Sequence, residues 1–149
     1  MILFAGMLPF ALLIAFMAFL VGTEILWILV DIPSLVVILL PLVYYLIVSK
    51  GHKVLGSYIK NSFKKDYIYN AYELKAISNV AKGSTKVIMT MSYLNIVFAL
   101  IIVLTNVDDP SFIGVALAVM LISLFYALGI SYLMFFPLQS WAENKLDME

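Results

Sequence analysis

The stretch FIGVALAVMLISLFYALGISYLMFFP, residues 112–137, contains no Lys, Arg, Asp or Glu, and as a helix it is long enough to cross the hydrocarbon core of a bilayer. Three further uncharged apolar stretches lie at residues 2–21, 33–48 and 87–104. Of the 149 residues, 64% are hydrophobic and 12% are charged, and the mean hydropathy is +1.08. A water-soluble body of this composition would expose large apolar patches. The sequence therefore predicts an all-α integral membrane protein, a single membrane domain over residues 1–149 with four transmembrane helices.

The lysines predict the orientation of these helices. Eight of the nine basic residues lie between the second and third apolar stretches, and the ninth, Lys145, follows the fourth. Because basic residues favour cytoplasmic loops, the loop 50–86 and the tail 138–149 are predicted to be cytoplasmic. An even number of spans then places the N-terminus on the same side. The expected location is a membrane that has both termini on its cytoplasmic side.

The basic loop 50–86 carries apolar residues at helical spacing, which predicts two short amphipathic helices broken near Lys65 and Asp66. Its lysines suit either anionic lipid headgroups or a docked protein, and the sequence leaves both open. His52 has no second ligand at metal-binding spacing, so no metal site is expected. The chain has no cysteine, no glycine-rich phosphate loop and a formal net charge of zero, so neither an enzyme, a cofactor nor nucleic-acid binding is expected.

Small and polar residues recur on one face of each of the last two predicted helices. They are Ser92, Asn95 and Ala99 on the third helix and Ala116, Ser123, Tyr126 and Ala127 on the fourth. Such residues commonly pack transmembrane helices together, and the alternative is that they line a pore. An ion path inside a membrane normally contains an ionisable residue, and these stretches have none. A pore here would need its charge from another protein.

The second predicted helix has a defined start. Asp31 precedes Pro33, and a proline is tolerated in the first helical turn because its missing N–H would have no partner there. An acidic residue beside that end interacts favourably with the helix dipole. Asp31 and Pro33 therefore predict a helix start at the membrane surface, and a part in ion uptake is the alternative for Asp31.

Several motifs together resemble the MotA/TolQ/ExbB family of ion-driven motor subunits, and MotA most closely. They are Asp31-Ile32-Pro33-Ser34-Leu35, Asn106-Val107-Asp108-Asp109-Pro110, Ile113-Gly114, Ala118-Val119 and Phe135-Phe136-Pro137-Leu138. The resemblance covers residues 1–50 and 85–146. It implies a homo-oligomeric ring, a pentamer in that family, around a dimeric single-span partner of the MotB, ExbD or TolR type. That partner carries the ion-binding Asp, and the transported ion is H⁺ or Na⁺.

The resemblance also implies roles for individual residues. The ion path would be formed by Ser92, Asn95, Ser123 and Tyr126, and the side chains packed against the partner would be Ala99, Ala116, Phe125 and Ala127. The external turn would consist of Asp108, Asp109, Pro110 and Gly114. Pro137 would couple ion flow to the cytoplasmic side. The chain departs from the family at Met89, where a proline is expected, and at Asn95-Ile96, where Gly-Thr is expected. The large cytoplasmic domain of MotA is reduced to the loop 50–86. A small four-helix transporter and a non-conducting scaffold are the alternative functions.

Overall fold

The computed structural model describes residues 2–22, 31–64, 67–105, 107–108 and 110–148, with all side chains in these ranges except those of residues 2–7, 10, 17, 21 and 110. Every regular element in this part of the chain is helical. The elements are α1 (Ile2–Val21), α3 (Ile32–Val48), α4 (Gly51–Ser62), α5 (Ala71–Thr105), α6 (Pro110–Ile130), a π-helical turn η1 (Ser131–Phe135) and α7 (Phe136–Leu146). The predicted all-α fold is confirmed.

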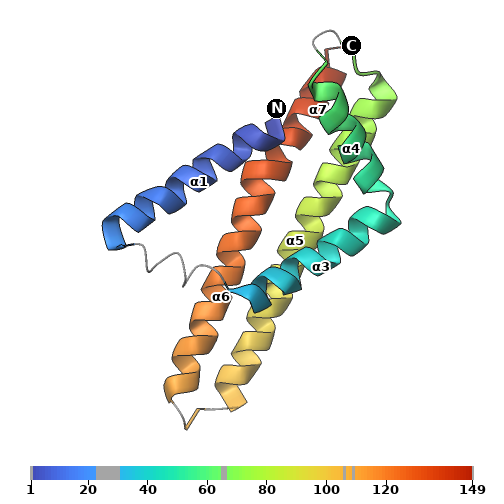
Figure 1. Ribbon diagram of the computed structural model, residues 1–149. Coiled ribbons are helices and arrows are strands. Elements are labelled where there is room, and N and C mark those ends of the chain that lie inside the picture. Colours follow the sequence, from blue (N-terminus) through green and yellow to red (C-terminus); the bar gives the residue numbers. More distant parts are fainter. Residues whose placement is uncertain (1, 23–30, 65–66, 106, 109, 149) are drawn as a thin grey trace.

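Two long antiparallel helical segments form the axis of the molecule (Figure 1). One is α5, whose 35 residues extend about 52 Å at 1.5 Å per residue. The other is α6, which continues through η1 into α7 and packs along α5 over its whole length. Each segment is roughly 20 Å longer than a hydrocarbon core of about 30 Å, so one end of a hairpin that crossed a bilayer would project from it.

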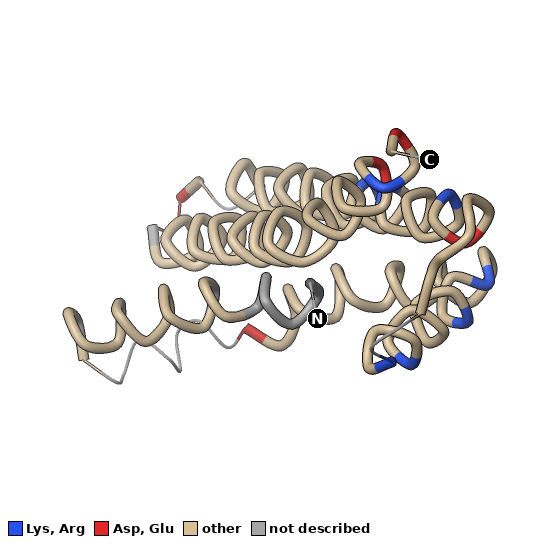
Figure 2. Tube along the Cα trace, turned by 90° about the horizontal axis from the view of Figure 1, so that it is seen from above, with Lys and Arg blue, Asp and Glu red and all other residues tan. Residues whose placement is uncertain are grey.

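The charged residues of the hairpin lie at one of its ends. Lys75, Lys82 and Lys86 lie in the first half of α5, and Lys145 lies in α7, which packs against that half. The lysines gather at this end of the hairpin (Figure 2). We therefore call residues 87–105 and 110–130 the membrane half of the hairpin, and residues 71–86 and 131–146 its charged half.

The predicted cytoplasmic loop 50–86 is largely helical. It contains α4 and the first part of α5, which joins the predicted third span without a break. The buried side chains Leu74, Ile77 and Ala81 recur at helical spacing and belong to the hydrophobic core, together with Leu138 of α7. This core packs α5 against α7 in the charged half, outside the apolar stretch 87–104. The predicted break at Lys65 and Asp66 falls outside the described residues.

By length and composition, the described residues do not clearly provide the four membrane spans that were predicted. The segments Ala71–Thr105 and Ser111–Leu146 are each long and apolar enough to cross a bilayer. α3 and α4 qualify only as one combined span, and they are bent by 88°. α3 alone has 17 residues, about 25 Å, which is short of the core thickness. The apolar run Ala11–Leu20 in α1 is shorter still. The described residues thus provide two spans, or up to three.

The bend between α3 and α4 has a local cause. Lys50 adopts the left-handed conformation with φ 55°, and Ser49 Oγ accepts a hydrogen bond from the Gly51 N–H at 3.3 Å. A Cβ on residue 51 would lie 3.0 Å from both Leu46 and Val80. The absence of a side chain at Gly51 therefore allows the turn to pack closely against α5. The left-handed conformation of this turn is adopted by Lys50 and not by the glycine.

The last helical segment contains a π-turn directly before Pro137. Pro137 has no N–H to donate, and its ring would crowd the carbonyl four residues earlier in a regular helix. The wider π-helical turn of η1 accommodates the proline without ending the helix, and the chain remains helical to Leu146. The helix continues past residue 137, where the predicted fourth span ends, and Ser131, Phe135 and Leu138 are buried on both sides of the proline.

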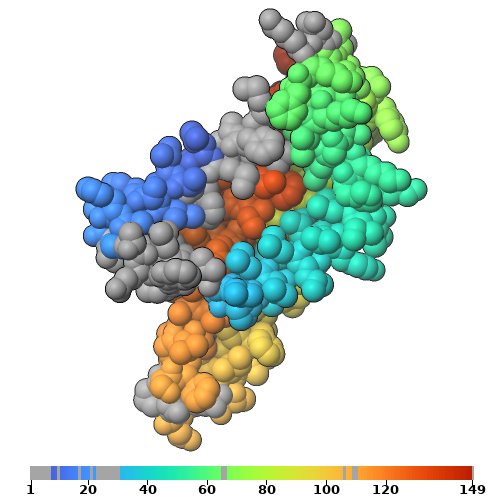
Figure 3. All heavy atoms as spheres, in the orientation of Figure 1, coloured from blue at the N-terminus to red at the C-terminus, as the bar shows by residue number. Residues whose placement is uncertain are grey.

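The remaining helices cover only part of the hairpin. α3 crosses α5 and contacts α6, whereas α1 contacts η1 and α7 and leaves the hairpin at an angle (Figure 1). The far end of the hairpin therefore extends beyond α3 (Figure 3). Its apolar side chains, among them Leu104, Val115 and Leu121, are exposed, as expected of a surface that faces lipid.

Candidate functional site

The four residues predicted to form the ion path are all buried within the single chain. Ser92 and Asn95 of α5 are 0% and 9% exposed, and Ser123 and Tyr126 of α6 are 0% and 8% exposed. α5 packs against both α3 and α6. The small and polar faces are therefore covered by the helices of this chain, and the large apolar side chains face outward.

The hydrogen bonds of these four residues differ. Ser123 Oγ donates to the carbonyl of Met120 at 3.0 Å, and the Tyr126 hydroxyl accepts from the N–H of Asp31 at 3.1 Å. Within the described residues, Ser92 Oγ and Asn95 Nδ2 have no hydrogen-bond partner. Each unpaired buried polar group costs about 1–3 kcal/mol.

Asp31 lies beside the middle part of the α6–α7 segment and not near the start of α6 at Pro110. Its contact, Tyr126, is about 24 Å along α6 from Pro110 at 1.5 Å per residue. Asp31 caps α3 as predicted, since its Oδ2 accepts from the Ser34 N–H at 3.1 Å, and Pro33 occupies the first turn. The head of α3 is therefore held against the membrane half of α6.

The residues predicted to pack against a partner lie mostly inside the chain. Ala99, Ala116 and Ala127 are 3%, 6% and 0% exposed, and Phe125 is half-buried. Small side chains let transmembrane helices approach closely, which explains their place in the packed face of α5 and α6. A partner that met these side chains would first have to displace another part of this chain.

The external turn is only partly described. Asp108 is exposed, Pro110 begins α6, and Asp109 falls outside the described residues. A Cβ at Gly114 would meet no atom within 4 Å, so this glycine lies on an open surface. Pro137 is half-buried beside η1, where the helix changes its winding. Pro137 therefore lies far along the α6–α7 segment from Pro110 and the predicted external turn.

A cavity of about 390 Å³ lies between α3, α5 and α6. Its walls are formed by Pro33, Ser34 and Val37 of α3, by Asn95, Phe98, Ala99 and Ile102 of α5, and by Phe112, Val115, Ala116 and Val119 of α6. Ser34 and Asn95 are the polar residues of this lining, and it contains no charged side chain. We call it the membrane cavity. The sequence marked Asn95, but it could not pair Asn95 with Ser34 across two helices.

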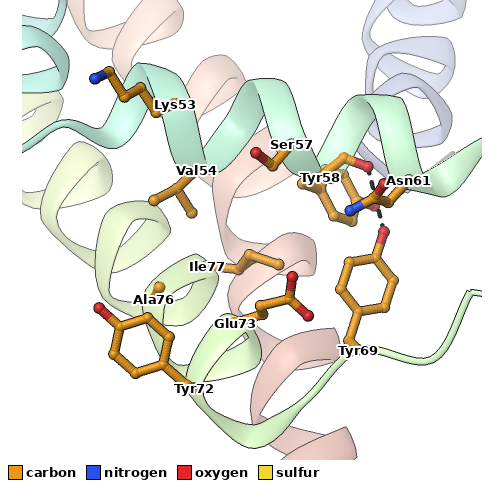
Figure 4. Close-up of a pocket in the computed structure, with 10 residues that line it drawn as sticks. All are labelled: Lys53, Val54, Ser57, Tyr58, Asn61, Tyr69, Tyr72, Glu73, Ala76 and Ile77. Atoms are coloured by element: carbon orange, nitrogen blue, oxygen red, sulfur yellow. Dashed lines mark hydrogen bonds between the residues drawn. The ribbon is translucent and has the colours of Figure 1, made fainter.

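A second, smaller cavity of about 190 Å³ lies in the charged half, between α4 and the start of α5 (Figure 4). Lys53, Ser57 and Asn61 line it from α4, and Tyr72 and Glu73 line it from α5. Its position is set by the start of α5. The Glu73 N–H donates to Asn70 Oδ1 at 2.8 Å, and the Asn70 N–H donates to Glu73 Oε2 at 3.1 Å. This reciprocal cap is visible in the sequence as Asn-x-x-Glu.

The Glu73 carboxylate is already engaged. Its Oε1 accepts a hydrogen bond from the Tyr67 hydroxyl at 2.7 Å, in addition to the backbone bond at Oε2. This hydrogen bond raises the pKa of Tyr67, with burial and the negative charge of Glu73 adding to the effect. Glu73 is therefore part of the helix start. Among the described residues no three His, Cys, Asp or Glu side chains are grouped to hold a metal ion.

Comparison of the chain with protein-family models, with curated proteins and with solved structures gave no match. The resemblance to ion-driven motor subunits therefore remains a prediction from the motifs.

Proposed function

We propose that this chain is a MotA-like subunit of an ion-driven rotary motor. In this proposal five copies form a ring around a dimeric single-span partner that carries the ion-binding Asp, and the flow of H⁺ or Na⁺ turns the ring. One observation carries the proposal: the membrane half of the α5–α6 hairpin contains buried polar side chains but no Lys, Arg, His, Asp or Glu, and the lysines of the hairpin lie in its charged half. Such a subunit supplies an uncharged wall and needs a titrating group from elsewhere.

The driving force follows from the membrane potential. One elementary charge that crosses the membrane releases about 2.3 kcal/mol per 100 mV. Five identical subunits cannot all match a two-fold partner at once, so neutralising one partner carboxylate favours the next angular position. In this scheme Ser92, Asn95 and Ser123 replace part of the hydration of the moving ion, and Tyr126 and Phe125 narrow its path.

The coupling to the cytoplasmic side would run along the α6–α7 segment. A displacement near Tyr126 reaches α7 through η1 and Pro137 without a loop in between. At the far end, Glu143 Oε1 accepts hydrogen bonds from Ser78 Oγ at 2.9 Å and from Gln139 Nε2 at 3.1 Å. The bond from Ser78 ties α7 to α5, and the bond from Gln139 lies within α7, so both helices of the charged half would move together.

The proposed topology places four spans in a bacterial or archaeal cytoplasmic membrane, with both termini in the cytoplasm. α1 and α3 would complete the four, and the exposed apolar side chains of α3, such as Leu40 and Val43, suit a lipid-facing helix. The lysines of α4 would lie near the anionic headgroups of the same leaflet.

The test is purification of the chain from its native membrane. A five-membered ring that carries a single-span protein with an acidic transmembrane residue is expected. Replacing Asn95 and Ser123 together by Ala should then reduce ion-driven activity at least tenfold, whereas Thr90→Ala, on the exposed side of α5, should not. Ion flux through vesicles that contain this chain alone would contradict the proposal, because no titrating group crosses the membrane without the partner.

A second candidate is a non-conducting membrane scaffold, and the burial of the polar faces favours it. Ser92, Ala99, Ala116 and Ser123 are covered by the chain's own helices, as side chains that serve only helix assembly would be. A scaffold would purify with a partner but would lose no ion-driven activity in the Asn95 and Ser123 variant. A small transporter is a weaker candidate, because such a protein generally needs an acidic residue inside the membrane. In the described chain, Asp31 alone among the acidic residues is held beside the membrane half by a hydrogen bond to α6, and that bond uses its backbone N–H.

A further inference from the structure

Large apolar side chains are exposed around the start of α5, at the lysine-rich end of the molecule. Phe63, Ile68 and Tyr72 are 76%, 86% and 84% exposed. Ser62 Oγ lies 3.3 Å from the Tyr69 hydroxyl, which brings the end of α4 next to the start of α5. Exposed apolar side chains that gather at one place mark an interaction surface.

Lipid does not reach this surface in a hairpin that spans a bilayer. Tyr72 lies about 21 Å along α5 from Lys86, where the membrane half begins. The headgroup layer on each side of the hydrocarbon core is only about 5–8 Å thick. The surface around the start of α5 therefore faces water, and a protein is the partner that suits it.

The smaller cavity, between α4 and α5, opens on this surface (Figure 4). Its volume of about 190 Å³ is below the roughly 300–1,000 Å³ of small-molecule sites, so it suits a side chain better than a separate ligand. Val54, Ala76 and Ile77 line it together with the exposed Tyr72. An apolar side chain therefore fits it best.

The charges around the cavity select acidic neighbours for that side chain. Lys53 lines the cavity and is exposed, and Lys75 is exposed near the start of α5. The carboxylate of Glu73, which also lines the cavity, already accepts hydrogen bonds from the Tyr67 hydroxyl and a backbone N–H. Residues 50–86 contain eight lysines and only two acidic residues. An acidic segment is therefore attracted to this surface.

The segment after α7 has this chemistry. α7 ends at Leu146, and Met148 is 77% exposed. Met148 stands between Asp147 and Glu149 in the sequence. A methionine side chain is flexible and fills irregular apolar gaps. α7 and the start of α5 lie at the same end of the molecule (Figure 1).

Membrane orientation brings this segment of one copy level with the cavity of another. The lysines that determine orientation are the same in every copy, so all copies are inserted the same way round. Residues 147–149 of one copy and the cavity of its neighbour then lie at a similar height above the membrane. Met148 is not among the residues that line the cavity of its own chain, and it remains exposed.

We propose that this surface binds a second copy of the chain: Met148 of one copy enters the cavity between α4 and α5 of the next, and Asp147 pairs with the lysines at its rim. The contact joins two different surfaces, so it builds a ring where the rotation closes. The inference rests on the homo-oligomer of the proposed function, and it requires neither the single-span partner nor ion flow.

The experiment uses disulfide formation between two differently tagged full-length copies in phosphatidylcholine vesicles. The chain has no cysteine, so a disulfide reports only the designed pair. One copy carries Met148→Cys, and the other carries Ala76→Cys, which lines the cavity. Oxidation is expected to give a covalent dimer with both tags. Asn79→Cys is the matched control, since Asn79 is exposed on α5 about one turn away and does not line the cavity.

A charge exchange provides the second measurement. Asp147→Lys in the copy with Met148→Cys should lower the disulfide yield about fivefold, because it brings like charges together. Lys53→Glu in the copy with Ala76→Cys should then restore the yield. A yield that ignores both changes would overturn the pairing.

The number of copies, measured by native mass spectrometry of the unmodified chain, separates this proposal from the proposed function. A ring in which the Ala76 and Asn79 positions link equally, or not at all, would overturn the contact and leave the ring standing. A monomer would overturn both.

Discussion

The backbone N–H of Asp31 donates a hydrogen bond to the hydroxyl oxygen of Tyr126 at 3.1 Å, and this bond joins the head of α3 to α6 across 95 residues of sequence. The Asp31 carboxylate meanwhile caps the same helix through the Ser34 N–H. The two interactions together fix where α3 begins relative to the hairpin. They also bring the one acidic residue at the start of α3 to the level of the proposed ion path.

Replacing Tyr126 by Phe should loosen this attachment. The Asp31 N–H loses its acceptor in a partly buried place, so the free energy of unfolding should fall by about 1 kcal/mol. Thermal unfolding in detergent measures the change. Tyr132→Phe is the matched control, because Tyr132 is 52% exposed on the same helical segment. An equal loss for both variants would show that the hydrogen bond to Asp31 contributes nothing.

Substitutions of Asp31 separate its capping role from its charge. Asp31→Asn keeps a side-chain acceptor for the Ser34 N–H, and asparagine is as good an N-cap as aspartate, so stability should be unchanged. Asp31→Ala removes the cap and should cost about 1 kcal/mol. If the charge matters for ion uptake, Asp31→Asn should abolish ion-driven activity at full stability, measured as ion flux in the purified complex. Normal flux in this variant would limit Asp31 to capping.

The fold could be predicted in part from the sequence. The apolar stretches 87–104 and 112–137 predict the helices of the membrane half, and the second stretch also reaches through η1 to Pro137, because a helix that faces lipid is apolar in composition. The extension of α5 back to Ala71 could not be found in this way, since Lys75, Lys82 and Lys86 lower the local hydropathy. The signals that remained were the Asn70–Glu73 cap and the helical spacing of buried apolar residues.

The candidate site could be predicted less well. Helical spacing places Ser92, Asn95 and Ala99 on one face of α5, and the structure buries all three. Spacing does not reveal what covers that face, because packing within a chain and packing against a partner select the same small residues. The bond between Asp31 and Tyr126 and the pairing of Ser34 with Asn95 in one cavity depend on the crossing of α3, which no local pattern encodes. The π-turn likewise follows from Pro137 only once Phe135 and Leu138 are known to be buried.

The raised pKa of Tyr67 predicts a dependence of stability on alkaline pH. Because the folded pKa lies above the unfolded value of about 10, the stabilisation by the bond to Glu73 is complete below that pH and is lost as pH rises through the raised pKa. Glu73→Gln should return the pKa toward its ordinary value, since the neutral amide removes the charge but keeps the helix cap. A ¹³C NMR titration of labelled tyrosine, with the Tyr67 signal assigned from Tyr67→Phe, measures this. An unchanged pKa in Glu73→Gln would contradict the assignment of its cause.

The contact between Tyr45 and Gly83 should decide how α3 crosses α5. A methyl group on residue 83 would overlap the Tyr45 side chain, so Gly83→Ala should destabilise the protein by about 1–3 kcal/mol through overpacking. Without this overlap the same change in a helix interior would stabilise by about 1 kcal/mol, so the sign of the effect reports the contact. Gly56→Ala in α4 is the matched control, because no atom lies within 4 Å of its Cβ position, and it should stabilise. The double variant with Tyr45→Ala should recover most of the loss in Gly83→Ala, because the overlapping ring is gone. Additive losses in the double variant, measured by chemical unfolding in detergent, would show that α3 does not cross α5 at this position.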